Sequence, residues 1–174
     1  ILVNNSVVHT MKGFDGDIAG WEASLQVNAT GAFYLTRAVG NRMAAAGKGS
    51  IISIASIYGV VGPDKTHYEG TDMDVDGGGG DYYQHKAGLI NLTRHFAARY
   101  GANGVRVNCI SPGGRFFKEQ PQPAVFVERY NKRTFLGRMA DEDDIKGVIV
   151  FLASDASKYV TGENIMVDGG YVQK

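Results

Sequence analysis

Residues 81–101 read DYYQHKAGLINLTRHFAARYG, a run in which apolar side chains recur at intervals of three and four. The members of this apolar face are Leu89, Ile90, Leu92, Phe96, Ala97 and Tyr100. Such spacing is typical of an amphipathic helix, and Gly101 is a suitable residue for its C-terminal end. The sequence therefore predicts a helix over residues 81–101.

Tyr82 and Lys86 lie four residues apart, so on a helix they share one face. A free phenol titrates near ~10, and a fixed ammonium group nearby favours the phenolate. The pair could therefore work as a tuned general acid and base. A tyrosine and a lysine also occur at this spacing by chance, so the surrounding sequence has to decide between the two readings.

On both sides of this segment, short runs rich in β-branched residues alternate with longer segments whose apolar residues have helical spacing. The expected strands are residues 1–3, 50–55, 105–110 and 164–168. The other expected helices are residues 18–46, with Asp17 as N-cap and Gly47 beyond the end, and one that begins at Asp141 with acidic residues in its first turn. Residues 115–138 are expected to form short helices over a loop. This alternation predicts a parallel sheet with helices on both faces.

Length and composition suit a single α/β domain over residues 1–174. Equal numbers of basic and acidic residues, 18 of each, argue against nucleic acid or a membrane as partner. The one cysteine, Cys109, cannot form an internal disulfide, and we expect a cytoplasmic protein. The four histidines show no metal-ligand spacing, so no metal site is expected; His85 and His95 are expected at the helix surface.

Three loops are expected to meet at one edge of the sheet. Asn4, Ser56 and the pair Pro112-Gly113 each follow the carboxyl end of a predicted strand. In parallel α/β sheets, ligands bind in the crevice beyond these strand ends. The sequence therefore predicts one binding crevice at this edge.

With these positions in place, the chain resembles the short-chain dehydrogenase/reductase family over essentially its whole length. The matching pieces, in order, are Asn4-Asn5, Val27-Asn28-Ala29-Thr30-Gly31, Ser56, Tyr82-x-x-x-Lys86, Pro112-Gly113 and Val167-Asp168-Gly169-Gly170. The resemblance implies a Rossmann-like, doubly wound parallel sheet in three α/β/α layers. It also implies hydride transfer between a small-molecule alcohol or ketone and NAD or NADP, and a homodimer or homotetramer.

The resemblance assigns roles residue by residue. Tyr82 would be the general acid/base, and Ser56 would hydrogen-bond the substrate oxygen. Lys86 would lower the tyrosine pKa and hold the ribose of the nicotinamide, and Asn28 would kink its helix and position a water. The expected cofactor contacts are Asn4, Ser6, Tyr82, Lys86, Pro112, Gly113 and Gly114.

Two positions depart from the family pattern. Val7 stands where the family has a glycine that gives the adenosine side close access, which puts the cofactor fit in question. Phe117 stands where a threonine often touches the carboxamide, and we expect Gly114 to let the backbone approach instead.

The largest departure is an acidic, glycine-rich insertion at residues 62–81, which places 25 residues between Ser56 and Tyr82. We interpret it as an active-site rim that shapes the substrate pocket, the alternative being a mobile, solvated loop. Asp72-x-Asp74-x-Asp76-Gly77 begins like a calcium loop, but its twelfth position is Tyr83 where a bidentate Glu is required. Together with residues 110–114, the insertion resembles most a branch associated with acylneuraminate-type sugar biosynthesis.

A family member is expected to begin with a strand, a Gly-rich phosphate turn and a helix. These 174 residues contain no such turn after a strand. We therefore interpret the chain as the C-terminal portion of the fold, supplying the last four strands of the family order 3-2-1-4-5-6-7. The alternative is a catalytically incomplete fragment that serves only as a dimerisation or scaffold module.

Overall fold

The computed structural model describes residues 1–75 and 79–174. Four parallel strands form one sheet in the order β1 (Leu2–Asn4), β2 (Gly49–Ile54), β3 (Val105–Pro112) and β4 (Asn164–Val167). Every pair of neighbouring strands is joined by a crossover, as the sequence predicted. The central strands β2 and β3 are buried on both faces because both faces are covered by helices.

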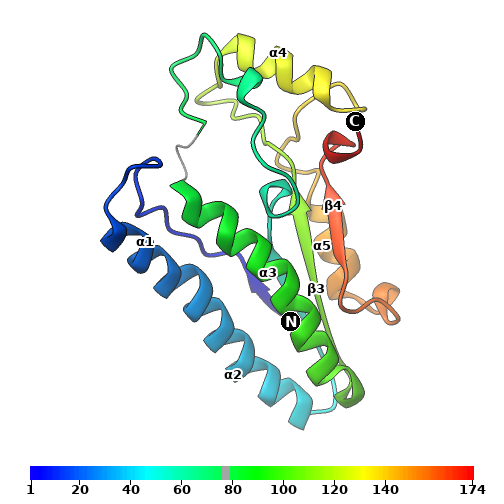
Figure 1. The fold of residues 1–174 in the computed structure, drawn as a ribbon. Helices are drawn as coiled ribbons and strands as arrows, with labels where there is room; N and C mark the ends of the chain where they lie inside the picture. Colours follow the sequence, from blue (N-terminus) through cyan, green and yellow to red (C-terminus); the bar gives the residue numbers. More distant parts are fainter. Residues whose placement is uncertain (76–78) are drawn as a thin grey trace.

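Successive side chains along the central strands point to opposite faces of the sheet, and so into different helical layers. Ile51 and Val107, paired in register, pack with Phe96 and Tyr100 under α2 (Ala32–Ala45) and α3 (Gly79–Tyr100). Ile52 points the other way and packs under α5 (Lys146–Ala153). Figure 1 shows the sheet between these two helical layers. The predicted three-layer α/β/α arrangement is confirmed.

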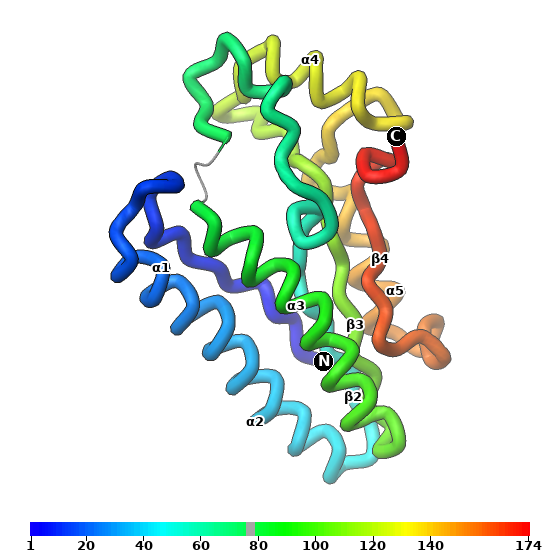
Figure 2. Tube along the Cα trace, in the orientation of Figure 1, coloured from blue at the N-terminus to red at the C-terminus, as the bar shows by residue number. Residues whose placement is uncertain are grey.

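The helix expected over residues 18–46 is one continuous rod with an irregular middle. It consists of α1 (Ile18–Leu25), a π-helical turn (Gln26–Gly31) and α2, and it runs beside α3 in Figure 2. Asp17 caps it as predicted, accepting a hydrogen bond from the Ala19 amide at 3.0 Å.

Two expected boundaries shift by two residues. α3 begins at Gly79, two residues earlier than predicted, and β3 extends two residues further, to Pro112. Residues 115–138 hold one helix, α4 (Ala124–Arg133). Five short 3-10 segments complete the described elements: Ile57–Gly59, Lys65–His67, Gly101–Asn103, Asp155–Ser157 and Tyr171–Gln173.

The prediction that a helix begins at Asp141 was wrong, since α5 starts at Lys146. The acidic residues that precede α5 form side-chain hydrogen bonds instead of the first turn of a helix. The Asp141 carboxylate accepts hydrogen bonds from the amides of Asp143 and Asp144, and the Asp144 carboxylate binds Arg138 at 2.6 and 2.8 Å. The side chains thus compete with the helical backbone pattern.

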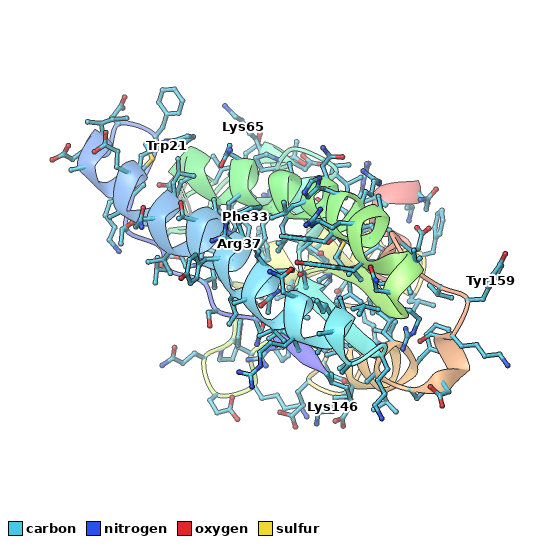
Figure 3. All side chains as sticks on the ribbon, turned by 90° about the horizontal axis from the view of Figure 1, so that it is seen from below. Trp21, Phe33, Arg37, Lys65, Lys146 and Tyr159 are labelled. Atoms are coloured by element: carbon cyan, nitrogen blue, oxygen red, sulfur yellow. The ribbon has the colours of Figure 1, made fainter. Side chains whose placement is uncertain are left out.

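The surface of the α1–α2 rod carries apolar side chains that no described element covers, among them Val27, Phe33, Tyr34 and Leu35. The Arg37 guanidinium lies 5.4 Å from the Phe33 ring centre and 5.2 Å from that of Tyr34. Figure 3 shows Phe33 and Arg37 next to each other on the rod. Within the described residues, no helix has both the length and the apolar character needed to cross a bilayer.

The two faces of α5 provide a test of the layered core. Leu152 is fully buried, whereas Val150, two residues earlier, is 66% exposed. Leu152→Ala is expected to lower the free energy of unfolding by about 2–5 kcal/mol because it leaves a cavity. Val150→Ala is the matched control and should change it by less than about 0.5 kcal/mol. Urea denaturation measures both, and equal effects would contradict the assignment of the buried face.

Candidate active site

Ser56 and Tyr82 are brought together at the carboxyl end of β2. Ser56 is buried two residues beyond the end of the strand, and its hydroxyl accepts a hydrogen bond from the Tyr58 amide at 3.1 Å. This leaves the hydroxyl hydrogen available, because a serine has one donor and two acceptor sites. Tyr82 lies in the first turn of α3, and the neighbouring Ser56 hydroxyl lowers the pKa of its phenol. Two of the predicted catalytic residues are therefore in contact.

Lys86 lies one turn further along α3, with its side chain directed at the sheet. Its Nζ donates to the Ile54 carbonyl oxygen at 2.6 Å and lies 5.5 Å from the ring centre of Tyr82. Burial lowers the pKa of Lys86 to about 8. Burial also raises the pKa of Tyr82, which the Ser56 hydrogen bond lowers. The lowering of the Tyr82 pKa expected from Lys86 stays a prediction.

Asn28 is buried inside the π-helical turn and is fully hydrogen-bonded. Its Oδ1 accepts from the Val8 amide at 2.9 Å, and its Nδ2 donates to the Val8 carbonyl at 2.8 Å and to the Ser24 hydroxyl at 2.9 Å. The amide therefore ties the segment after β1 to the helix. A π-turn in place of regular helix at Asn28 agrees with the predicted kink, while the water-positioning role stays a prediction.

The residues expected to contact a cofactor lie along the same edge. Asn4 donates from Nδ2 to Thr36 at 2.9 Å and to Ser53 at 3.4 Å, whereas its buried Oδ1 has no hydrogen-bond partner in the described part of the chain. Ser6 is exposed. A buried amide oxygen without a partner is unusual and marks a place where an additional donor fits.

Pro112, Gly113 and Gly114 follow β3, and the two glycines accommodate Tyr130. A Cβ at Gly114 would lie 2.9 Å from Cζ of Tyr130, and the Gly114 amide donates to the Tyr130 hydroxyl. Close approach of the backbone at Gly114 was expected, but its observed partner is this tyrosine.

A cavity of about 710 Å³ opens beside the catalytic pair. It is lined by Ser56, Tyr82, Gly113 and Gly114, together with Tyr58, Tyr68, Tyr83, Phe117, Phe126, Tyr130, His9, Ile57, Met73, Asp74, Val75, Arg115, Gln122 and Met139. We call this the catalytic cavity. Its aromatic wall was not predicted, because it assembles from segments far apart in the sequence whose patterns do not show that they meet.

The insertion at residues 62–81 forms part of that wall in its described portion. Tyr68, Met73, Asp74 and Val75 line the catalytic cavity. The hydroxyls of Tyr58 and Tyr68 are 2.9 Å apart, and Arg129 of α4 donates to the carbonyl oxygens of Thr66 and Glu69. These contacts favour the rim interpretation over the solvated loop.

For the calcium interpretation, Asp76 and Gly77 lie outside the described residues. Among the residues that are described, no three carboxylate, histidine or cysteine side chains converge in a way that could hold a metal ion.

His85 was expected at the surface, and this prediction was wrong. The side chain is buried, its Nδ1 lies 3.1 Å from the Asp81 carbonyl oxygen, and its ring meets that of Tyr82 edge-on at 5.4 Å. The His9 ring also lies near Tyr82, at 5.2 Å. Two imidazoles are therefore close to the predicted acid/base. Helical periodicity did not reveal the burial of His85, because it depends on the contact between α3 and the rod containing α1.

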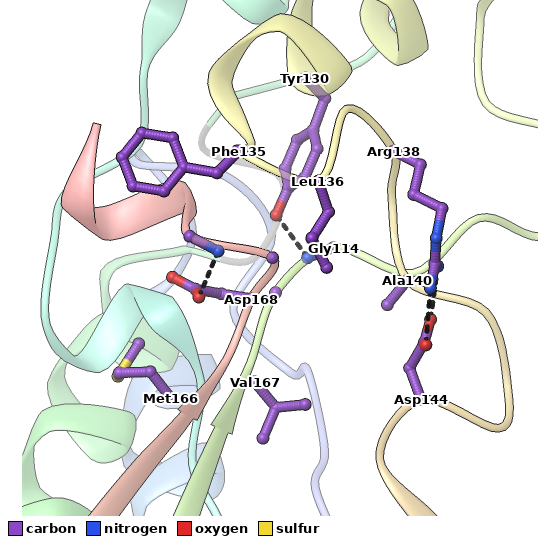
Figure 4. Close-up of a pocket in the computed structure, with 13 residues that line it drawn as sticks. Gly114, Tyr130, Phe135, Leu136, Arg138, Ala140, Asp144, Met166, Val167 and Asp168 are labelled. Carbon is purple, nitrogen blue, oxygen red and sulfur yellow. Dashed lines mark hydrogen bonds and ion pairs between the residues drawn. The ribbon is translucent and has the colours of Figure 1, made fainter.

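A second hollow, of about 460 Å³, is also lined by Gly113 and Gly114. Figure 4 shows the side chains around it. Its polar groups are already paired. Arg138 binds Asp144, and the two oxygens of Asp168 accept from the amides of Gly170 and Val172 at 2.9 Å. The remaining wall is apolar and includes Phe135 and Leu136. None of the predicted catalytic residues lines this hollow.

A family model described as "Enoyl-(Acyl carrier protein) reductase" matches residues 1–172. The chain is 34% identical over 177 residues to cis-4-hydroxycyclohexanecarboxylate dehydrogenase of Sinomonas cyclohexanicum, covering 98% of this chain and 65% of the relative. It is 36% identical over 179 residues to 2-dehydro-3-deoxy-D-gluconate 5-dehydrogenase of Bacillus subtilis, covering 100% and 65%. The chain thus spans slightly less than two thirds of the length of these curated relatives.

Two of the solved structures that this chain resembles are also dehydrogenases. A short chain dehydrogenase from Leptospira borgpetersenii with bound NAD+ superposes with a TM-score of 0.85 at 35% identity, covering 98% of this chain and 63% of that one. A gluconate 5-dehydrogenase from Burkholderia cenocepacia in complex with NADP and tartrate gives 0.82 at 29% identity, covering 99% and 64%. Both agree with the Rossmann-like α/β/α sheet described above.

The burial of His85 predicts a pH dependence of stability. Burial, and after it the charge of Lys86, lowers the pKa of His85 to about 4. An unfolded histidine titrates near ~6.5, so between these values the unfolded chain binds the additional proton and stability falls as the pH falls. We expect an NMR titration of the His85 ring to have its midpoint near 4. The free energy of unfolding should also fall less steeply from pH 6.5 to 4 in His85→Gln. A ring midpoint near 6.5 would contradict the burial.

Proposed function

The chain belongs to the short-chain dehydrogenase/reductase family, and on that premise we propose that it catalyses NAD- or NADP-dependent interconversion of an alcohol and a carbonyl compound. The observation that carries the proposal is the contact between Ser56 and Tyr82 at the wall of the catalytic cavity, with Lys86 one turn behind. The cavity is of the size that binds small molecules, roughly 300–1,000 Å³.

The residues present are suited to the nicotinamide end of the cofactor. Lys86 has three donor hydrogens, of which the Ile54 carbonyl takes one, and the buried Oδ1 of Asn4 lacks a donor in the described part of the chain. Lys86 and the backbone at residues 112–114 would hold that end, with Tyr82 beside it, and Asn4 and Ser6 would contact the rest of the cofactor. The cofactor, when bound, supplies or accepts the hydride.

Ser56 and Tyr82 would handle the substrate oxygen and its proton. In the reduction direction, the Tyr82 phenol gives its proton to the carbonyl oxygen as charge develops there, and the Ser56 hydroxyl donates a hydrogen bond to the same oxygen. In oxidation, the phenolate removes the proton of the alcohol. A positive charge on Lys86 lowers the cost of the phenolate in either direction.

The aromatic wall excludes water around the reacting carbon and provides apolar contacts for the rest of the substrate. Tyr58 and Tyr68, as a hydroxyl pair, offer a polar point within it. The relatives named above are dehydrogenases of a hydroxylated ring carboxylate and of a sugar acid. We propose a small alcohol or ketone of comparable size as substrate.

The second candidate function is a dimerisation or scaffold module. The observation that favours it is the exposed apolar surface of the α1–α2 rod, which could pack against a second copy as a homodimer or homotetramer. Cofactor binding separates the two functions. A titration with NADH and NADPH, followed by quenching of Trp21 fluorescence, should saturate for the enzyme and show no binding for the scaffold.

The decisive variant is Tyr82→Phe, which removes the hydroxyl and keeps the ring. We expect turnover of alcohols and ketones, measured as formation or loss of reduced nicotinamide, to fall by about 10²–10⁴-fold. The melting temperature should change little because the hydroxyl is not part of the core.

Tyr159→Phe is the control, since Tyr159 is fully exposed and far from the cavity wall. Unaltered turnover in Tyr82→Phe would remove the assignment of the general acid/base.

A further inference from the structure

We propose that the catalytic cavity accepts an acidic substrate, a hydroxy acid or oxo acid, whose carboxylate is bound by Arg115. The inference deepens the proposed function and takes from it the position of the reacting oxygen at Ser56 and Tyr82. Arg115 lines the same cavity as these two residues. Ser56 and Tyr82 would then act on the reacting oxygen of the substrate, and Arg115 would bind its carboxylate.

The backbone that carries Arg115 is fixed on both sides. The Phe116 amide donates to the Ala140 carbonyl at 2.9 Å, and the Ala140 amide donates to the Gly114 carbonyl at 3.0 Å. Gln122 adds a second clamp, because its Nε2 donates to the Arg115 carbonyl at 2.6 Å and its Oε1 accepts from the Phe117 amide at 3.2 Å. The arginine therefore extends from a constrained segment.

The Arg115 side chain is oriented by an aromatic ring. Its guanidinium carbon lies 4.5 Å from the ring centre of Phe117. An arginine stacked on an aromatic face keeps the N–H groups at its edge free for a planar, bidentate partner such as a carboxylate. Phe117 stands where the family pattern has a threonine. In this proposal the role of its ring is to orient the Arg115 guanidinium.

Arg115 differs from Arg138, Arg129 and Arg106 in the partners of its guanidinium. Arg138 is paired with Asp144, Arg129 with two carbonyl oxygens of the insertion, and Arg106 with Ser157 and the Ser154 carbonyl. Among the ion pairs that the described residues form, none includes Arg115. Its guanidinium is thus available to an incoming anion.

The test compares acids with neutral analogues of the same size. The probe pairs are D-gluconate with D-glucitol, and cis-4-hydroxycyclohexanecarboxylate with cis-4-(hydroxymethyl)cyclohexanol. Binding is measured by isothermal titration calorimetry in the presence of NAD+ or NADP+ and turnover by nicotinamide absorbance. At least one acid should bind about tenfold or more tightly than its neutral partner, since charged hydrogen bonds are the stronger ones.

Arg115→Met should weaken binding of that acid by about 10- to 100-fold and leave the neutral analogue unchanged, and Arg115→Lys should restore part of the loss. Lys118→Met is the control, because it removes a nearby positive charge that does not line the cavity. Equal affinity for acids and neutral analogues, no binding of either acid, or equal effects of Arg115→Met and Lys118→Met would overturn the proposal.

Binding and turnover separate this inference from the proposed function. Acid binding that depends on Arg115, without turnover of any probe, would support the acid site and contradict the dehydrogenase activity. Turnover of the neutral analogues with the same efficiency as the acids, insensitive to Arg115→Met, would support the activity and overturn the acid site.

Discussion

The hydrogen bond from Lys86 to the Ile54 carbonyl joins the first turns of α3 to the end of β2. A buried ammonium group needs a hydrogen-bond acceptor, because its removal from water is otherwise too costly. The last carbonyl of a strand beneath a helix offers one. Since Tyr82 precedes Lys86 by one turn and Ser56 follows Ile54 by two residues, the same contact sets the phenol above the serine hydroxyl. The rest of the site depends on this alignment of helix and strand.

Around that fixed pair, the cavity divides into two kinds of wall. The carboxyl edge of the parallel sheet supplies Ser56 and Gly113, which follow β2 and β3. The insertion and α4 supply the other wall, through Tyr68 and Phe126, whose rings are 5.2 Å apart. Groups for chemistry thus come from the sheet edge and α3, whereas groups for recognition come from the segments packed over them. This arrangement allows one chemistry to serve different substrates.

The sequence predicted the layered fold because strand and helix patterns are local, and the runs at residues 50–55 and 81–101 are unambiguous. Strand order also predicted that Asn4, Ser56 and Pro112-Gly113 lie at one edge of the sheet, whereas the pairing of Ser56 with Tyr82 came only from the resemblance to the family. The sequence did not predict the burial of His85, which depends on a contact between helices some sixty residues apart in the chain. Nor did it predict the start of α5, where Asp141 and Asp144 bind nearby amides and Arg138 and so displace the helix. Both the burial of His85 and the start of α5 depend on contacts that a local sequence pattern does not show.

The attachment of the insertion to α4 has a consequence for how such a protein can change over generations. Arg129 holds the insertion through the carbonyl oxygens of Thr66 and Glu69, and every residue type carries a carbonyl. The side chains of Thr66 and Glu69 can therefore be exchanged while this anchorage persists, and neither of them lines the cavity. His67, between them, is buried against Phe126 and Tyr171, so its exchange would disturb the packing under the insertion. Within one short segment, some positions are thus open to variation and a neighbouring one is not.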